Sequence, residues 1–255
     1  MKMQVKYYDL ENKNVFVSGG GSGIGASIVE HFCEQGSNVF FVDIDLGESE
    51  KLIKTITEKK FKKPNFIECD LLDIKKLNSI ISKVINDNGP IDILINNAAN
   101  DQRHTTDDVD EEYWDNRMGI NLKHFFFTIK AVKDGMIKKG SGSIINLGSV
   151  SWMLGEGDKV AYETAKSAVV GLTRSFAKEL GKHNIRANSV VPGSIATERQ
   201  IKHWLTPEYK KWLLDKQCLK RQLKPSDVSS LVLYLASDVS SGCTKQNFIV
   251  DAGIT

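Results

Sequence analysis

The strongest constraint on the fold of this chain is a regular alternation of short apolar segments with longer amphipathic segments. The short segments are rich in β-branched and aromatic residues, which fits strands buried on both faces; they cover 14–18, 38–42, 65–69, 91–96, 143–147, 185–191 and 246–250. Helical periodicity marks the segments between them, for example 25–36 and 163–181, and the second is predicted to close at its glycine, Gly181. Strand followed by helix, repeated about six times, predicts an α/β fold: a doubly wound, seven-stranded parallel sheet with helices on both faces.

No proline-rich, serine-rich or repetitive segment divides the 255 residues, so we expect a single domain over residues 1–255. One segment departs from the rhythm: 193–222 is long, lies between the sixth and seventh predicted strands, and carries two tryptophans. In an open α/β sheet, ligands bind outside the carboxyl ends of the strands. An insertion at that edge is therefore predicted to be a lid over a substrate.

Composition excludes several classes of partner. The net charge of +2 gives no electrostatic basis for binding nucleic acid or an anionic membrane. The N-terminus does not resemble a signal peptide, and no run approaches the ~20 apolar residues of a membrane span. The four cysteines are scattered without metal-site spacing: Cys33, Cys69, Cys218 and Cys243. The simplest interpretation is a cytoplasmic protein with reduced thiols and no metal.

A glycine-rich turn follows the first predicted strand and opens the next helix. The stretch "SGGGSGIG" (18–25) places Gly19, Gly23 and Gly25 at this turn. Glycines there allow a tight bend and a close approach of the backbone to a pyrophosphate at the positive end of the helix. A glycine-rich turn alone can be only a tight turn, but its position at the start of a repeated β/α chain favours a Rossmann-type nucleotide site.

Two aspartates at later strand ends extend this nucleotide site. Asp43 ends the second predicted strand, about 20 residues beyond the glycines, where a carboxylate accepts hydrogen bonds from both ribose hydroxyls and repels a 2′-phosphate. Neither Ser22 nor the residues after Asp43 supply a cation for that phosphate, so NAD is predicted over NADP. Asp70, after the third strand, is placed for the adenine amino group, with Leu71 beside the ring. Each aspartate has the alternative of capping the next helix.

Tyr162 and Lys166 are four residues apart in a predicted helix, so their side chains share one face. An ammonium beside a phenol stabilises the phenolate, which then acts as a base near neutral pH. Ser149 and Ser151 lie a short loop upstream, and no Gly-x-Ser-x-Gly elbow surrounds either, which argues against a serine hydrolase. Taken alone, a Tyr/Lys pair at this spacing is usually surface decoration.

Taken together, these motifs resemble the short-chain dehydrogenase/reductase family over nearly the whole chain. The glycine motif has Ser18 where the family has threonine, and "NNAA" (96–99) has Ala99 where the family has glycine. Asn121 in "MGINL" and Ser149, thirteen residues before Tyr162, match further family motifs. The Pro-Gly pair after the sixth strand, with two residues beyond it, matches at Pro192, Gly193, Ile195 and Thr197.

The resemblance implies roles for individual residues. It implies that Tyr162 is the acid/base, that Lys166 lowers its pKa and holds the nicotinamide ribose, and that Ser149 positions the reacting oxygen. Asn121 would hold a water that passes a proton from Lys166 to solvent. The cofactor, NAD, would be bound by Gly19, Ser22, Gly23, Ile24, Asp43, Asp70, Leu71, Asn97, Ala98, Tyr162, Lys166, Pro192, Gly193, Ile195 and Thr197.

Within that family, two strings resemble bacterial aldose 1-dehydrogenases, including galactose and xylose dehydrogenases: "NNAANDQRHT" (96–105) and "IINLGSVSWML" (144–154). The similarity continues through 197–205 and 217–219. It implies a sugar substrate held by polar groups and an aromatic face, with Asp101 and Arg103 nearby and with Asn100, His104, Ser149, Ser151, Trp152, Tyr162 and Trp204 as binding residues. Three alternatives stay open: His104 as a loop hydrogen-bonder, Arg103 paired with the acidic run 107–112, and Trp204 as lid packing.

The resulting hypothesis is an NAD-dependent oxidation of an aldose at C1 to the aldonolactone. Galactose is favoured, with xylose, arabinose, fucose or glucose next. One rival is a reductase of a ketone or 3-oxoacyl thioester on the same catalytic set, and another is a catalytically silent nucleotide-binding member. The resemblance further implies a homotetramer, with the helices 121–139 and 161–181 packing against their copies.

Overall fold

All seven predicted strands form one parallel sheet in the computed structural model, which describes residues 5–255. The order across the sheet is β3-β2-β1-β4-β5-β6-β7. The strands are β1 (Asn14–Ser18), β2 (Asn38–Asp43), β3 (Asn65–Glu68), β4 (Ile93–Asn96), β5 (Gly142–Leu147), β6 (Ile185–Pro192) and β7 (Asn247–Val250). The predicted α/β fold is confirmed, and the strand boundaries differ from the expected ones by at most two residues.

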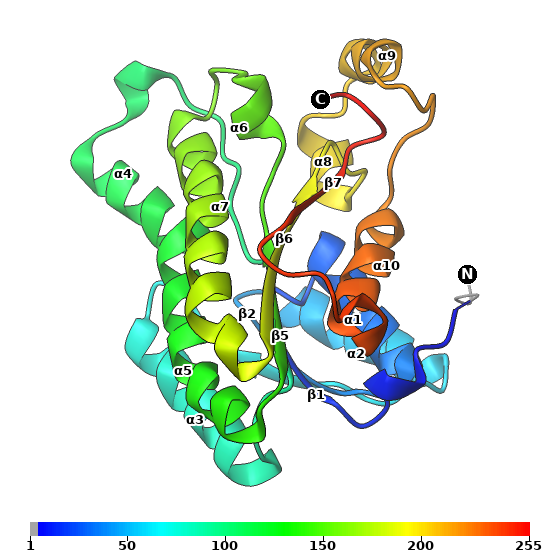
Figure 1. Ribbon diagram of the computed structural model, residues 1–255. Helices are drawn as coiled ribbons and strands as arrows, with labels where there is room; N and C mark the ends of the chain where they lie inside the picture. The colour runs from blue at the N-terminus through cyan, green and yellow to red at the C-terminus, as the bar shows by residue number, and fades with distance from the viewer. Residues whose placement is uncertain (1–4) are drawn as a thin grey trace.

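Helices cover both faces of the sheet (Figure 1). One layer consists of α1 (Gly23–Gln35), α2 (Leu46–Glu58) and α10 (Pro225–Ala236). The other consists of α3 (Ile74–Asn88), α4 (Glu111–Met118), α5 (His124–Lys139) and α7 (Val160–Leu180). Each layer buries its own apolar cluster against the sheet, so the core is divided in two by the strands.

The strand order reverses between β1 and β4. From β1 the chain builds outward to β3 on one side, and from β4 it builds outward to β7 on the other. At such a reversal the two neighbouring connections leave in opposite directions and open a crevice at the carboxyl ends of the strands. This point of the fold positions the site described below.

Helix α7 ends differently from the prediction. It stops at Leu180, but Gly181 keeps right-handed helical dihedral angles and continues into a short turn, Gly181–His183. The left-handed residue is Asn184, with φ of 58°. Asparagine tolerates that conformation better than most residues, so it terminates the segment here. The glycine after α1, Gly36, does take the left-handed conformation, with φ of 85°.

The segment 193–222 folds into two short helices, α8 (Glu198–His203) and α9 (Pro207–Lys216), which lie beside the C-terminus at the top of Figure 1. Thr197 and Thr206 cap these helices. Shorter elements are α6 (Ser151–Leu154), the 3₁₀ turns Tyr8–Leu10, Thr106–Asp108 and Asp238–Ser240, and a π turn at Gly119–Lys123. Within residues 5–255, no helix has the length and apolarity needed to cross a membrane.

A chain of buried polar side chains joins the sheet to the α5/α7 layer. Asn96 of β4 donates to Asn146 of β5 over 2.9 Å, and Asn146 donates to the Thr173 hydroxyl of α7 over 3.0 Å. At the other end of this chain of hydrogen bonds, the Thr128 hydroxyl of α5 donates to the side-chain oxygen of Asn96 over 2.6 Å. Water does not reach any of the four side chains. Because buried polar groups cost free energy unless they are paired, these contacts fix the seating of both helices.

Replacing Thr173 with valine tests the strength of this chain. Valine keeps the shape but leaves the buried Asn146 amide without its acceptor, which is expected to lower the free energy of unfolding by about 1–3 kcal/mol. Thr55→Val is a matched control, since Thr55 also donates to the carbonyl four residues earlier, but through a hydrogen bond that is exposed to solvent. We expect it to change stability by less than about 0.5 kcal/mol. Equal effects in urea unfolding would show that the buried chain is unimportant.

Candidate active site

A cavity of about 1210 Å³ opens at the carboxyl ends of the strands. The segments that line it include the glycine turn after β1, the end of β2, the segment after β3, the loop after β4, the segment between β5 and α7, and the segment after β6. Each residue of the predicted cofactor set lines this one cavity: Gly19, Ser22, Gly23, Ile24, Asp43, Asp70, Leu71, Asn97, Ala98, Tyr162, Lys166, Pro192, Gly193, Ile195 and Thr197. The fold therefore brings together residues that lie up to 178 positions apart in sequence, from Gly19 to Thr197.

The glycine turn requires glycine for steric reasons. Gly19 has φ of +67°, a conformation that side chains disfavour. A Cβ atom on Gly25 would lie 1.8 Å from the carbonyl oxygen of Gly19, which excludes any side chain there. The Asn97 amide donates to the same carbonyl over 2.8 Å and braces the turn against β4. The Ser22 side chain makes no capping bond at the start of α1, so backbone N–H groups at the positive helix end remain for an anion.

Neither strand-end aspartate caps the following helix. Asp43 accepts from the backbone of Gly21 over 2.7 Å and of Asp45 over 3.0 Å, whereas Asp45 is the residue that caps α2. Asp70 accepts from the backbone of Leu72 over 2.9 Å, and Asp73 caps α3. The capping alternative is therefore not realised for Asp43 or Asp70, and both carboxylates line the cavity.

One cation near Asp43 was missed by the sequence reasoning. Lys51 of α2 lines the same cavity and forms an ion pair with Glu48 over 3.5 Å. The expectation that no residue after Asp43 supplies a cation is thus incomplete. Lys51 lies eight residues after Asp43, and the turn of helix α2 places it at the rim of the cavity. The residues directly after Asp43 in the sequence carry no sign of this.

Tyr162 and Lys166 share one face of α7, as their spacing predicts. The Lys166 ammonium lies 5.7 Å from the centre of the Tyr162 ring and donates to the carbonyl of Leu147 at the end of β5 over 2.7 Å. Ser149 accepts from the backbone of Ser151 over 3.2 Å, and the two serine hydroxyls are 2.9 Å apart. Lys166 is only 1% exposed, so this pair is placed in a low-dielectric environment.

Burial moves the two pKa values in opposite directions. It raises the pKa of the Tyr162 phenol above its usual value; the Asp101 carboxylate adds to this, while the Ser149 hydrogen bond opposes it. Burial lowers the pKa of the Lys166 ammonium to about 7. Desolvation is therefore the largest influence on the pKa of both groups.

Asn121 holds the loop after β4 in place. It is fully buried in the π turn between α4 and α5. Its side-chain oxygen accepts from the backbone N–H of Asn100 over 2.8 Å, and its nitrogen donates to the Asn100 carbonyl over 3.2 Å. Both ends of the amide therefore hold the loop after β4. A π turn that interrupts an α-helix, as Gly119–Lys123 does between α4 and α5, is frequent at functional sites.

Comparison with known proteins identifies this arrangement. Residues 19–255 match the family described as enoyl-(acyl carrier protein) reductase. A D-xylose 1-dehydrogenase from Caulobacter vibrioides is 43% identical over 97% of both chains. A probable galactose dehydrogenase from Rhizobium meliloti is 41% identical over 98% of this chain and 97% of that one. A 3-oxoacyl-[acyl-carrier protein] reductase from Brucella melitensis, 27% identical, superposes with a TM-score of 0.89 over 100% of this chain and 98% of the other.

The chain belongs to the short-chain dehydrogenase/reductase family. Enzymes of this family are oxidoreductases that use a nicotinamide dinucleotide. The cavity fits such a cofactor in this chain, because the turn at Gly19 and Gly25 leaves no room for a Cβ atom and the start of α1 has no side-chain cap.

In this short-chain dehydrogenase/reductase the predicted substrate residues divide into two groups. Asn100, Ser149, Ser151 and Tyr162 line the cavity. His104, Trp152 and Trp204 are not among its lining residues in the part of the chain that the structure describes.

The placement of His104 matches the alternative of a loop hydrogen-bonder. Its Nδ1 lies 3.0 Å from the Tyr113 hydroxyl, and its Nε2 accepts from the backbone of Ala161 over 3.4 Å. The side chain is buried and ties the loop after β4 to the start of α7. A single histidine in a polar loop gives no signal in sequence that distinguishes this role from sugar binding.

Arg103 and Trp204 pack on each other. The Arg103 guanidinium lies 4.4 Å from the centre of the Trp204 ring and pairs with Asp158 over 3.2 Å. Trp204 therefore follows the alternative of lid packing. The suggested pairing of Arg103 with residues 107–112 is wrong, because the loop after β4 turns its arginine toward the start of α7.

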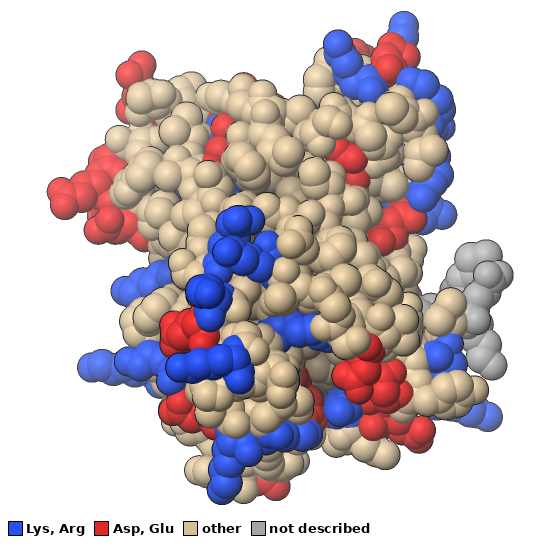
Figure 2. Space-filling view, in the orientation of Figure 1, with Lys and Arg blue, Asp and Glu red and all other residues tan. Residues whose placement is uncertain are grey.

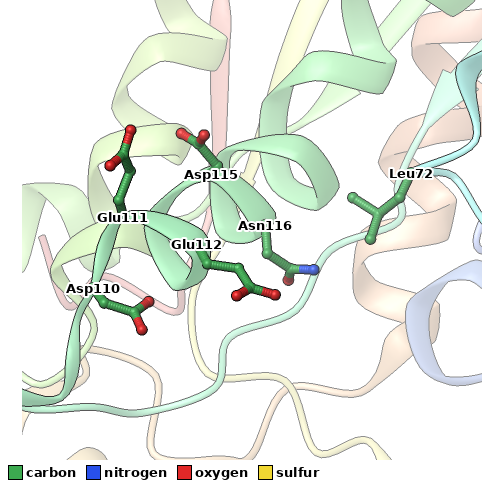
Figure 3. Close-up of a pocket in the computed structure, with 6 residues that line it drawn as sticks. All are labelled: Leu72, Asp110, Glu111, Glu112, Asp115 and Asn116. Carbon is green, nitrogen blue, oxygen red and sulfur yellow. The ribbon is translucent and has the colours of Figure 1, made fainter.

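The acidic residues of that run lie at the edge of the molecule over α4 in Figure 2. Figure 3 shows Asp110, Glu111, Glu112 and Asp115 spread over the surface of α4, with their carboxylates directed to different sides. Negative charge in the first turn of a helix is stabilised by the helix dipole. Residues 5–255 contain no group of three or more histidine, cysteine or acidic side chains able to hold a metal.

Several lining residues escaped the sequence reasoning: Glu156, Lys159, Arg199, Gln200 and Tyr209. Gln200 of α8 donates to Asp101 over 2.6 Å, and Arg199 pairs with the same carboxylate over 3.3 Å. Their signal is weak, because charged residues in loops and short helices are usually solvated. Their place over Tyr162 depends on how the 193–222 segment folds back across the sheet edge.

The depressed pKa of Lys166 predicts a pH-dependent stability. The unfolded chain keeps the lysine protonated up to about pH 10, whereas the folded chain releases the proton near pH 7. The contribution of this group to stability is therefore present at high pH and lost as the pH falls through about 7. Relative to Lys166→Met, the wild-type free energy of unfolding is expected to rise by roughly 1–2 kcal/mol from pH 7 to pH 9 in urea titrations. A difference that stays constant over this range contradicts the assignment.

Proposed function

We propose that this enzyme is an NAD-dependent aldose 1-dehydrogenase, which oxidises the anomeric hydroxyl of a pyranose to the aldonolactone. Near-full-length identity of 41–43% to a xylose and a probable galactose dehydrogenase carries the proposal. The cavity supports it, since its lining includes charged and polar side chains that suit a polyhydroxylated substrate, among them Asp101, Glu156 and Lys159.

In this proposal Tyr162 takes the proton of the anomeric hydroxyl. Ser149, which hydrogen-bonds Tyr162, holds the reacting oxygen in place. Lys166 supplies positive charge beneath the phenol and is held there by the Leu147 carbonyl. Asn121 acts through the backbone of Asn100 by fixing the loop that borders the site. A nicotinamide dinucleotide held by the cavity-lining residues would supply the acceptor for the hydride that leaves the sugar carbon.

The sugar is the finer part of the proposal. Galactose is the favoured substrate and xylose the next, with arabinose, fucose and glucose behind them. Glucose and xylose differ in one exocyclic hydroxymethyl group, galactose and glucose in the orientation of the C4 hydroxyl, and galactose and xylose in both. Discrimination of that size depends on a few hydrogen bonds in the cavity.

NAD rather than NADP is proposed from the place of Asp43. Its carboxylate is fixed at the end of β2 by the backbone of Gly21 and Asp45, and it lines the cavity. A charge there repels a 2′-phosphate. Lys51 is the competing feature, and its pairing with Glu48 reduces its positive field.

The second candidate is reduction of a 3-oxoacyl thioester. It is favoured by the description of the matching family and by a Thermotoga maritima 3-oxoacyl-[acyl-carrier-protein] reductase that is 34% identical over 96% of this chain. An acyl chain offers few partners to charged side chains. The lining by Asp101, Glu156 and Lys159 therefore favours the sugar.

The remaining proposals concern the whole molecule. We propose that 193–222 acts as a lid, that the protein is cytoplasmic, and that it assembles as a homotetramer through α5 and α7. Phe126 on α5 and Val160 on α7 are large apolar side chains, 44% and 41% exposed, and such groups suit an interface.

Tyr162→Phe tests the chemistry. Removal of the hydroxyl is expected to lower kcat for the best aldose by about 10²-fold or more, because the proton acceptor is lost. NAD⁺ binding, measured by calorimetry, should change little. Absorbance of NADH across a panel of aldoses, alcohols and hydroxyacyl compounds identifies the substrate. Turnover of a hydroxyacyl compound but of no aldose would reject the sugar assignment and keep the fold.

Asp43→Ser tests the cofactor preference. Loss of the carboxylate is expected to shift the ratio of kcat/KM for NAD⁺ over NADP⁺ by about tenfold or more toward NADP⁺. Asp73→Ser is the matched control, since Asp73 also accepts a backbone bond at a helix start but is not among the cavity-lining residues. If both variants keep the wild-type ratio, Asp43 does not select the cofactor.

A further inference from the structure

A row of alternating charges runs along the wall of the cavity between α6 and α7. Lys159 donates to Glu156 over 2.5 Å and to Asp158 over 2.9 Å, and Asp158 pairs in turn with Arg103. The Lys159 side chain is only 8% exposed, which is uncommon for lysine and requires paired partners. Glu156 ends the row, and its own side chain is 25% exposed.

Glu156 has one carboxylate oxygen in use. Lys159 bonds its Oε2, and within residues 5–255 no hydrogen-bond donor is placed on its Oε1. Both Glu156 and Lys159 line the cavity, together with Tyr162. Because Lys159 fixes the carboxylate, its second oxygen is pre-organised as an acceptor at the cavity wall.

Tyr209 of α9 lines the cavity on the side of the 193–222 segment. It stacks on Trp212, with 5.5 Å between ring centres and 29° between ring planes. The negative charge of Glu156 contributes to a raised pKa at both Tyr162 and Tyr209, so Glu156 lies within electrostatic reach of the two phenols. The Arg103 guanidinium lies 4.4 Å from the centre of the Trp204 ring and 6.0 Å from that of Tyr209, and of the two aromatic side chains Tyr209 is the one that lines the cavity.

This combination matches a polyhydroxylated ring. Sugar hydroxyls are hydrogen-bond donors, and a fixed carboxylate accepts from them more strongly than a neutral group does. The C–H face of the ring packs on an aromatic side chain. A site that uses a charged acceptor discriminates against a substrate that lacks the hydroxyl, because the acceptor loses its water when the substrate covers it and is then left unpaired.

We propose that Glu156, held by Lys159, is a specificity-determining residue that accepts a hydrogen bond from a non-anomeric hydroxyl of the sugar, with Tyr209 as the aromatic wall for its ring. This inference rests on the proposed aldose dehydrogenase function and names the residues that select the sugar.

The experiment measures kcat/KM with NAD⁺ for wild type, Glu156→Gln and Glu208→Gln. The substrates are the best aldose and its monodeoxy analogues. Glu208 is a matched control because it is also a carboxylate, precedes Tyr209 on α9 and is not among the cavity-lining residues.

Wild type is expected to lose about 10- to 100-fold in kcat/KM on one deoxy analogue. Glu156→Gln should lose about tenfold or more on the parent sugar, mainly through KM, and should lose about twofold or less on that analogue. Glu208→Gln should keep the wild-type pattern. NAD⁺ affinity, measured by calorimetry, should be the same in all three proteins.

Tyr209→Leu is the second variant. It is expected to raise KM for the parent sugar and for each deoxy analogue by a similar factor, since ring packing does not depend on one hydroxyl. A selective loss in Glu156→Gln together with a uniform loss in Tyr209→Leu supports the proposal.

Two results overturn the proposal. If Glu156→Gln lowers kcat/KM equally for the parent and every analogue, Glu156 does not read a hydroxyl. If wild type oxidises no aldose, the proposed function fails first and the inference fails with it. The wild-type assay on the parent sugars therefore separates the two failures.

Discussion

The positions of Tyr162 and Lys166 depend on one buried chain of hydrogen bonds. Asn96 and Asn146 are register partners on β4 and β5, and their amides link through Thr173 to α7. Lys166 is seven residues, about two helical turns, before Thr173, and it bonds the end of the same strand at Leu147. The helix is thus fastened to β5 at two levels. Because amides deep in the core have no water to replace a lost partner, the helix has one favourable seating, and that seating places Tyr162 at the cavity.

Burial gives the site its electrostatic character. The same desolvation that raises the pKa of Tyr162 lowers that of Lys166, so the protein alone favours two neutral groups where chemistry calls for a phenolate and an ammonium. Charges on the surrounding loops act on this balance. Asp101 raises the pKa of Tyr162 and Arg199 lowers it. The two side chains also form an ion pair that joins the loop after β4 to α8. The loops that are proposed to choose the substrate therefore also influence the pKa of Tyr162.

Sequence patterns predicted the sheet because buried parallel strands require uninterrupted apolar runs, as in 14–18 and 38–42. They predicted the cofactor edge because steric and charge requirements are local: Gly19 and Gly25 must be glycine whatever surrounds them. They were less informative about the end of helix α7, which stops at Leu180 and is followed by a 3₁₀ turn that begins at Gly181, and about Lys51, which reaches the cavity by the pitch of a helix. The roles of aromatic and polar loop residues were the hardest to predict from the sequence, since a tryptophan or histidine packs equally well in several surroundings.

The sequence by itself therefore determined the α/β architecture, the nucleotide edge and the Tyr162–Lys166 pair, because each depends on spacing within one element or on a rule for one turn. Tertiary structure alone decided that His104 ties loops together, that Trp204 packs on Arg103, and that Glu156 and Tyr209 border the cavity instead. These roles depend on contacts between segments about 50 to 100 residues apart. The geometry of such contacts follows from how the 193–222 segment and the loops after β4 and β5 fold over one sheet edge, which no local pattern encodes.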